Sequence, residues 1–179
     1  MINLKEKKCL IAYFSRKGNN YFSGKVVNLP IGNTEVLAKI IQEIIVCDTF
    51  QIETVNSYPE DYTETTEAAH EELLADARPE ITNHMENMSS YDVIFLGYPN
   101  WWGTMPMPVF TFLDEYDFSG KVIIPFCTHE GNEIERSGKD IAKLCPKATL
   151  LKSFCVHGSL VNVAKKDIIN WLDKIGIIS

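Results

Sequence analysis

One stretch of the chain decides its fold: Val93-Ile94-Phe95-Leu96-Gly97-Tyr98-Pro99-Asn100-Trp101-Trp102-Gly103. The first four residues form a continuous apolar run, which is typical of a buried strand in a parallel sheet. Successive side chains of an extended backbone point to opposite faces, so the two adjacent tryptophans cannot both turn inward. We therefore expect at least one indole to meet solvent or a ligand. The alternative is that both cap the core at the end of the strand.

Strands and helices alternate along the rest of the chain. Short apolar runs predict strands at 9–14, 49–55, 92–98, 121–128 and 149–154. Helical spacing and stop signals predict helices at 33–46, 62–77, 107–116, 134–144 and 163–175. Such alternation indicates an α/β fold, a doubly wound five-stranded parallel sheet with helices on both faces. The length of 179 residues and the hydrophobic content of 45% fit a single domain over residues 1–179.

Composition excludes several classes of function. A net charge of −7 argues against a nucleic-acid binder. The sequence shows no leader pattern and no apolar run near the roughly 20 residues that span a bilayer, so we expect a cytoplasmic protein without a membrane segment. The five cysteines form no C-x-x-C pair and have no histidine at zinc-ligand spacing, which predicts reduced thiols, mostly in the core, and no metal site. They are Cys9, Cys47, Cys127, Cys145 and Cys155.

The loop after the first predicted strand could bind a phosphate group. Ser15, Arg16 and Lys17 begin this loop, and after an insertion it reaches Gly32-Asn33-Thr34 at the start of the first helix. Free amides, hydroxyls and the helix dipole favour an anion there, although Gly-Asn-Thr can also be a plain helix cap. The sequence contains neither G-x-x-x-x-G-K-[ST] nor G-x-G-x-x-G, so we expect a phosphate monoester on a smaller cofactor.

Two further loops should lie at the same edge of the sheet, because ligands of such folds bind at the carboxyl ends of the strands. The loop after the third strand could stack a flat ring on an indole, and the loop after the fourth could hold the opposite edge of that ring. A small phosphorylated ligand with a flat ring is FMN. The residues concerned are Pro99, Asn100, Trp101, Trp102 and Gly103, and Thr128, His129, Glu130, Gly131 and Asn132.

On these segments the chain resembles the flavodoxin family, specifically short-chain flavodoxin-like proteins with an extended first loop. The resemblance implies an FMN cofactor, a sheet order of 2-1-3-4-5 and phosphate contacts from Ser15, Asn33 and Thr34. It also implies that 99–103 and 128–132 flank the isoalloxazine ring. The chain departs from the family in its long first loop, and in His129 and Glu130, where many relatives carry small residues. The segments that carry the resemblance are 12–16, 32–34, 97–106 and 125–131.

The resemblance implies electron transfer with redox partner proteins. An indole stacked on the oxidised ring and an acidic surface both lower the potential, so we expect a low-potential electron carrier. One alternative is an FMN-dependent NAD(P)H:quinone-type reductase, since the same fold hosts both functions. Another is a cofactor-free protein-binding module with the tryptophans as a hot spot. We assign no catalytic residue. We interpret His70 as a solvated surface residue, and Cys127 as a buried structural thiol, with a redox thiol as the alternative.

Overall fold

A parallel sheet forms the centre of the molecule, as a computed structural model covering residues 6–131 and 135–178 describes it. The sheet has the order β4-β1-β5-β6-β7, and β8 also pairs with β6. Because β7 and β8 share the fifth position, this is the predicted order 2-1-3-4-5. The strands are β1 (Cys9–Tyr13), β4 (Asp48–Gln51), β5 (Val93–Pro99), β6 (Val122–His129), β7 (Thr149–Leu150) and β8 (Phe154–His157).

The fifth strand is interrupted, whereas the sequence predicted one strand over 149–154. β7 pairs with the start of β6, and β8 pairs with its end. The carbonyl of Ile123 accepts a hydrogen bond of 3.0 Å from the amide of Leu151, so the odd-numbered residues of β6 turn their backbone polar groups toward the fifth strand. Pro125 has no N–H to donate at the next such position. The ladder therefore breaks between β7 and β8.

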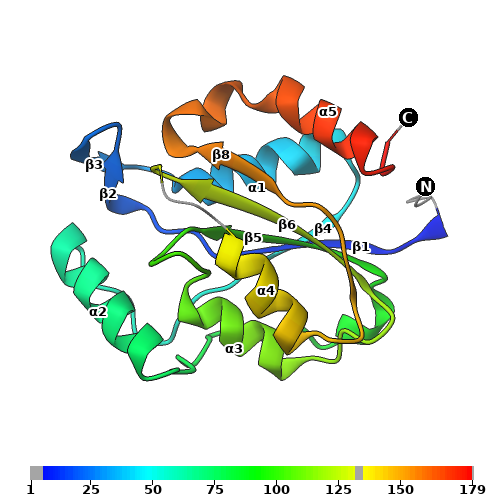
Figure 1. Cartoon of the computed structure of the whole chain (residues 1–179), viewed down its shortest axis with the longest axis horizontal. Helices are drawn as coiled ribbons and strands as arrows, with labels where there is room; N and C mark the ends of the chain where they lie inside the picture. The colour runs from blue at the N-terminus through cyan, green and yellow to red at the C-terminus, as the bar shows by residue number, and fades with distance from the viewer. Residues whose placement is uncertain (1–5, 132–134, 179) are drawn as a thin grey trace.

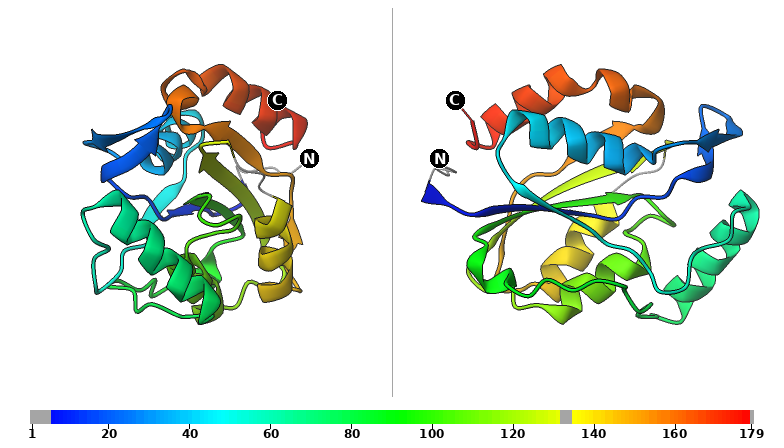
Figure 2. Two further views of the ribbon diagram at one scale, coloured as in Figure 1. Left: turned by 60° about the vertical axis from the view of Figure 1, so that its left-hand side comes forward. Right: turned by 180° about the vertical axis from the view of Figure 1, so that it is seen from behind.

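Helices cover both faces of the sheet, as predicted (Figures 1 and 2). On one face α1 (Asn33–Ile44) and α5 (Lys165–Lys174) pack on a core that includes Leu37 and Ile168. On the other face lie α2 (Tyr62–Leu74), α3 (Met107–Glu115) and α4 (Glu135–Leu144). Two short 3-10 helices, η2 (Met88–Ser90) and η3 (Gly158–Val163), complete the fold, and none of the helices in the described ranges could cross a bilayer.

The insertion in the first loop forms a β-hairpin, which the sequence did not predict. β2 (Gly18–Phe22) and β3 (Lys25–Leu29) pair as a separate antiparallel sheet. The two turn residues, Ser23 and Gly24, have φ angles of 50° and 89°, as a two-residue turn of type I′ requires. Figure 1 shows this hairpin beyond the carboxyl ends of the parallel strands, close to the first turn of α2.

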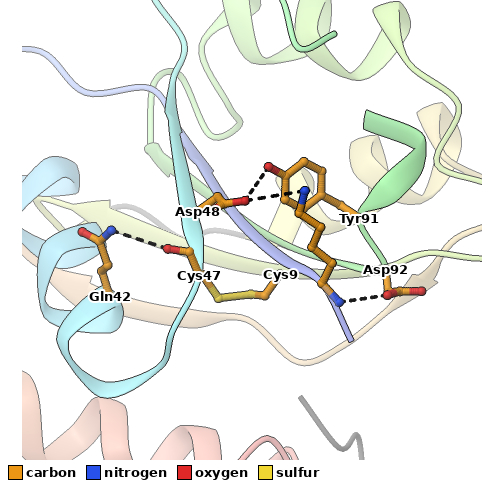
Figure 3. The surroundings of a disulfide bond; sticks show 7 residues. Cys9, Gln42, Cys47, Asp48, Tyr91 and Asp92 are labelled. Carbon is orange, nitrogen blue, oxygen red and sulfur yellow. Dashed lines mark hydrogen bonds and ion pairs between the residues drawn. A yellow bond between two sulfur atoms is a disulfide. The ribbon is translucent and has the colours of Figure 1, made fainter. Parts of the chain in front are cut away.

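A disulfide joins Cys9 to Cys47, so the prediction of reduced cysteines is wrong for this pair. The two residues lie 38 positions apart, but Leu10 pairs with Asp48 across β1 and β4, which brings the cysteines together. Figure 3 shows the bond next to Asp48, whose carboxylate accepts a hydrogen bond of 2.7 Å from the hydroxyl of Tyr91. The other three cysteines are free thiols, Cys127 and Cys145 buried and Cys155 exposed.

Candidate functional site

Loops after β1, β5 and β6 converge at the carboxyl edge of the sheet and line a pocket of about 370 Å³. Most of the predicted site residues line it, namely Ser15, Arg16, Asn33, Thr34, Pro99, Asn100, Trp101, Thr128, His129 and Glu130. Sequence reasoning did not assign four more contributors, which are Asn20 and Tyr21 of the hairpin, Tyr62 of α2 and Gly158 of η3. The rings of Tyr21 and Tyr62 stack 6.0 Å apart, which ties the hairpin wall to α2.

The N-terminus of α1 forms one end of this pocket. The amides of Asn33 and Thr34 open the helix and have no carbonyl partner one turn before them within it. Ser15 Oγ already accepts the amide of Glu35 over 3.0 Å, and Thr34 Oγ1 bonds Thr128 Oγ1 over 2.9 Å. Gly32 caps the helix behind this layer, where a Cβ would lie 2.2 Å from Ser15 Oγ. This end suits an anion held by backbone amides, hydroxyls and the helix dipole.

Arg16 lines the pocket, but its guanidinium is already engaged. It donates to the carbonyl of Asn19 and to the carbonyls of Pro59 and Glu60 at 2.7 and 2.8 Å. Burial lowers the pKa of Arg16, and the neighbouring Asp61 and Glu60 oppose that shift. Arg16 therefore braces the hairpin base against the loop before α2. Lys17 lines a separate cavity of about 780 Å³ and does not line the 370 Å³ pocket.

The two tryptophans take different positions. Trp101 is half-buried and packs edge-on against Phe14 and Tyr58, with ring centroids 5.4 and 5.2 Å away. Trp102 is 47% exposed and stacks on His70 at 4.2 Å. One indole thus meets solvent, as expected, while the other contributes to the pocket wall.

Trp102 and Gly103 lie outside the 370 Å³ pocket. Trp102 Nε1 donates to the carbonyl of Thr66 over 3.0 Å, and Trp102 lines an adjoining cavity of about 200 Å³. Gly103, at a φ of 82°, turns the loop so that Trp101 and Thr104 exchange backbone hydrogen bonds. His70 is correspondingly half-buried under Trp102, which corrects its interpretation as a solvated residue.

Glu130 connects the two walls of the pocket. Its Oε2 accepts the amide of Ser23 at the hairpin tip over 3.1 Å and lies 3.4 Å from Nε2 of His157. Its Oε1 is buried and has no hydrogen-bond partner within the described residues. A Cβ on Gly158 would lie 2.3 Å from that Oε1 and 2.4 Å from Asn33 Nδ2. The turn of the hairpin, Glu130 after β6, the first residue of η3 and the first residue of α1 therefore meet at this corner.

His129 is held in its neutral form. Its Nδ1 accepts the amide of Gly131 over 3.1 Å. Burial and the nearby His157 lower the pKa of His129, and Glu130 opposes them. Gly131 adopts a φ of 112° in this turn and does not line the pocket. The predicted site residue Asn132 lies outside the described residues.

These residues fit a phosphorylated ligand with a flat ring. Amides and hydroxyls gather at the α1 end, and the indole of Trp101 stands in the wall. Asn100 Oδ1 is a second buried acceptor without a partner in the described part of the chain, which suits a ligand that brings its own donors. No cluster of three or more metal-ligating side chains is found in residues 6–131 and 135–178.

Comparison with known proteins identifies the family. A protein from Bacteroides eggerthii assigned as a flavoprotein is 27% identical, with a TM-score of 0.78, and the match covers 97% of this chain and 100% of that one. A flavoprotein from Lactobacillus acidophilus NCFM, solved in complex with FMN, is 20% identical with a TM-score of 0.64, covering 88% and 97%. A search of curated proteins gives no match. The model of the family described as Flavodoxin matches residues 8–175, so this chain belongs to the flavodoxin family.

Proposed function

We propose that the protein binds FMN in the 370 Å³ pocket and works as a low-potential electron carrier. The observation that carries the proposal is the opening of the α1 N-terminus into the same pocket as the aromatic loop. Ser15, Asn33 and Thr34 would hold the phosphate, and Trp101 with Thr128 and its neighbours would border the ring. When bound, FMN supplies one- and two-electron chemistry. The FMN complex of the Lactobacillus relative supports this assignment.

The charges around the pocket favour a low potential. Glu130 places a carboxylate in the wall, and the lowered pKa of His129 leaves that ring uncharged at neutral pH. The guanidinium of Arg16 is shared among three backbone carbonyls. Added negative charge in the pocket is therefore disfavoured, because little free positive charge compensates it. An uncharged His129 adds no positive charge that would stabilise a reduced anion at pH 7.

One observation favours a reductase as the second candidate function. The 200 Å³ cavity shares Arg16, Asn100 and Trp101 with the larger pocket and extends from it toward α2. A small electron acceptor could occupy this cavity. An electron carrier does not need such a cavity, because it transfers electrons through an exposed edge of the flavin ring. NADH or NADPH oxidation by the holoprotein alone would support this candidate.

An anaerobic reductive titration tests both functions after FMN uptake has been measured by absorbance. Bound flavin with two separate one-electron potentials, both low, and negligible NADH or NADPH oxidation would support the carrier. Rapid turnover with a nicotinamide would support the reductase. If the protein takes up no FMN, the proposal fails, and a cofactor-free binding module becomes the better interpretation.

The cellular location needs a measurement of its own. A cytoplasmic location is our proposal from the sequence, whereas disulfides such as Cys9–Cys47 are typical of oxidising compartments. Fractionation of the source cells combined with trapping of free thiols would show where the protein resides and whether this bond is present there.

A further inference from the structure

Two free thiols lie on neighbouring strands beside the pocket. Cys127 of β6 and Cys155 of β8 are register partners in a parallel pair. Neighbouring strands are about 4.8 Å apart. This separation falls within the roughly 4.4 to 6.8 Å between Cα atoms that a disulfide spans. The backbone therefore already places the two cysteines at bridging distance.

The two thiols also share a face of the sheet. Phe126 and Phe154 are register partners, and both pack with the core under α1 and α5. Side chains alternate along a strand, so the next residue on each strand points to the opposite face. Cys127 accordingly belongs to the core of that opposite face. Burial raises the pKa of Cys127 most, and the nearby Cys155 raises it further, as expected for adjacent thiols.

The two cysteines differ in their access to solvent. Cys127 is 0% exposed and donates its thiol hydrogen to the carbonyl of Thr128 over 3.4 Å. Cys155 is exposed, and its closest partner is a weak contact of 3.7 Å with Ser153 Oγ. Within the described residues β8 pairs only with β6, so this strand of four residues can shift toward β6 without breaking another ladder. An external reagent therefore meets Cys155 first.

We propose that Cys127 and Cys155 form a second redox site, a dithiol that a small disulfide oxidises to an intramolecular disulfide. The thiolate of Cys155 attacks the external disulfide, forms a mixed disulfide and releases one thiolate. Cys127 then loses its proton and attacks the Cys155 sulfur, which releases the second thiolate. The protein gives up two electrons and two protons, and the external disulfide becomes two thiols.

This site has a direct structural link to the pocket. Thr128 follows Cys127 along β6, and both Thr128 and Gly158 line the pocket. The proposed bond therefore forms one residue from the wall that we assign to FMN. The chemistry itself requires only the two thiols and an external disulfide, so it is independent of the proposed function.

The test uses the full-length chain treated with oxidised glutathione, followed by alkylation of remaining thiols and peptide mass spectrometry. We expect a linked Cys127–Cys155 peptide, a loss of two hydrogens and one alkylated cysteine, Cys145, in place of three. The variant Cys155→Ser should give no link and leave Cys127 reduced. Cys127→Ser should stop at a mixed disulfide on Cys155.

Cys145→Ser is the matched control, because Cys145 is also a buried thiol but lies in the loop after α4. It should form the link as fast as the wild-type chain. A stable glutathione adduct on wild-type Cys155 with Cys127 still reduced would overturn the proposal, as would the absence of any reaction. Both results are readable on the wild-type chain, so poor folding of a variant would not obscure the answer.

Discussion

At the scale of single residues, position 158 has room only for glycine, because two side chains from other segments approach it closely. An alanine Cβ there would lie 2.3 Å from Glu130 Oε1 and 2.4 Å from Asn33 Nδ2. Asn33 starts α1, so Gly158→Ala should displace both the helix end and Glu130. We expect FMN affinity to fall by about tenfold, or about 1.4 kcal/mol, measured by flavin fluorescence titration.

Gly138→Ala is the matched control for this substitution. Gly138 lies in α4 with no atom within 4 Å of the added Cβ, so the variant should bind FMN like the wild-type chain. Alanine also favours a helix over glycine by up to about 1 kcal/mol. If Gly158→Ala binds FMN with unchanged affinity, this corner does not take part in binding.

His129 should make stability depend on pH. Its folded pKa is lowered, first by burial, below an unfolded value of about 6.5. The unfolded chain then binds more protons, so stability is full above about pH 6.5 and is lost as pH falls toward the folded pKa. His129→Gln should flatten this part of the profile in urea unfolding at pH 7.5 and 5.5. A wild-type slope for His129→Gln would contradict the argument.

At the scale of elements, the Cys9–Cys47 disulfide ties β1 to the segment that enters β4. A bond across 38 residues stabilises by about 3 to 4 kcal/mol in the chain-entropy model. The double variant Cys9→Ala/Cys47→Ala should lose about that much free energy of unfolding in urea. Its FMN affinity should stay unchanged, because Cys9 starts β1 and the pocket lies beyond the other end of the strand. Equal stability of the variant and wild type would mean that the two thiols are not bonded in solution.

At the scale of the whole molecule, the net charge of −7 should govern association with redox partners. Exposed carboxylates gather on and before α2, close to the pocket, and they are Glu60, Asp61, Glu64, Glu67 and Glu71. Glu72 does not belong to this patch, since it is half-buried and accepts the Tyr58 hydroxyl over 2.6 Å. Electron transfer from the reduced holoprotein to a basic cytochrome should slow by about tenfold between low and high salt.

A neutral small-molecule acceptor serves as the control for this salt effect, because its rate should hardly change. Glu64→Gln/Glu67→Gln should reduce the salt dependence without altering FMN affinity. If the rate of electron transfer to the basic cytochrome does not depend on ionic strength, the exposed carboxylates on and before α2 do not take part in docking.

The sequence by itself determined the alternation of strands and helices and the three loops that meet at one edge of the sheet, whereas the order of the strands came from its resemblance to the flavodoxin family. The alternation and the loops follow from local information. The apolar run at 93–96 marks a buried strand, and parallel strands bring their carboxyl ends to one edge. Ser15, Asn33, Trp101 and Thr128 were found in this way, since each lies at the end of a strand, in the loop that follows a strand or at the start of a helix.

Tertiary structure decided the features that depend on pairing between distant segments. The sequence separates Cys9 from Cys47 and Ser23 from Glu130, and only strand register and loop packing bring each pair together. The sequence places Arg16 in the predicted phosphate loop, but only the folded chain shows that its guanidinium donates to three backbone carbonyls. Local patterns record which residues are buried, because burial follows the period of each element. They do not record which neighbour a buried or charged group contacts, because tertiary folding alone brings residues from distant segments together.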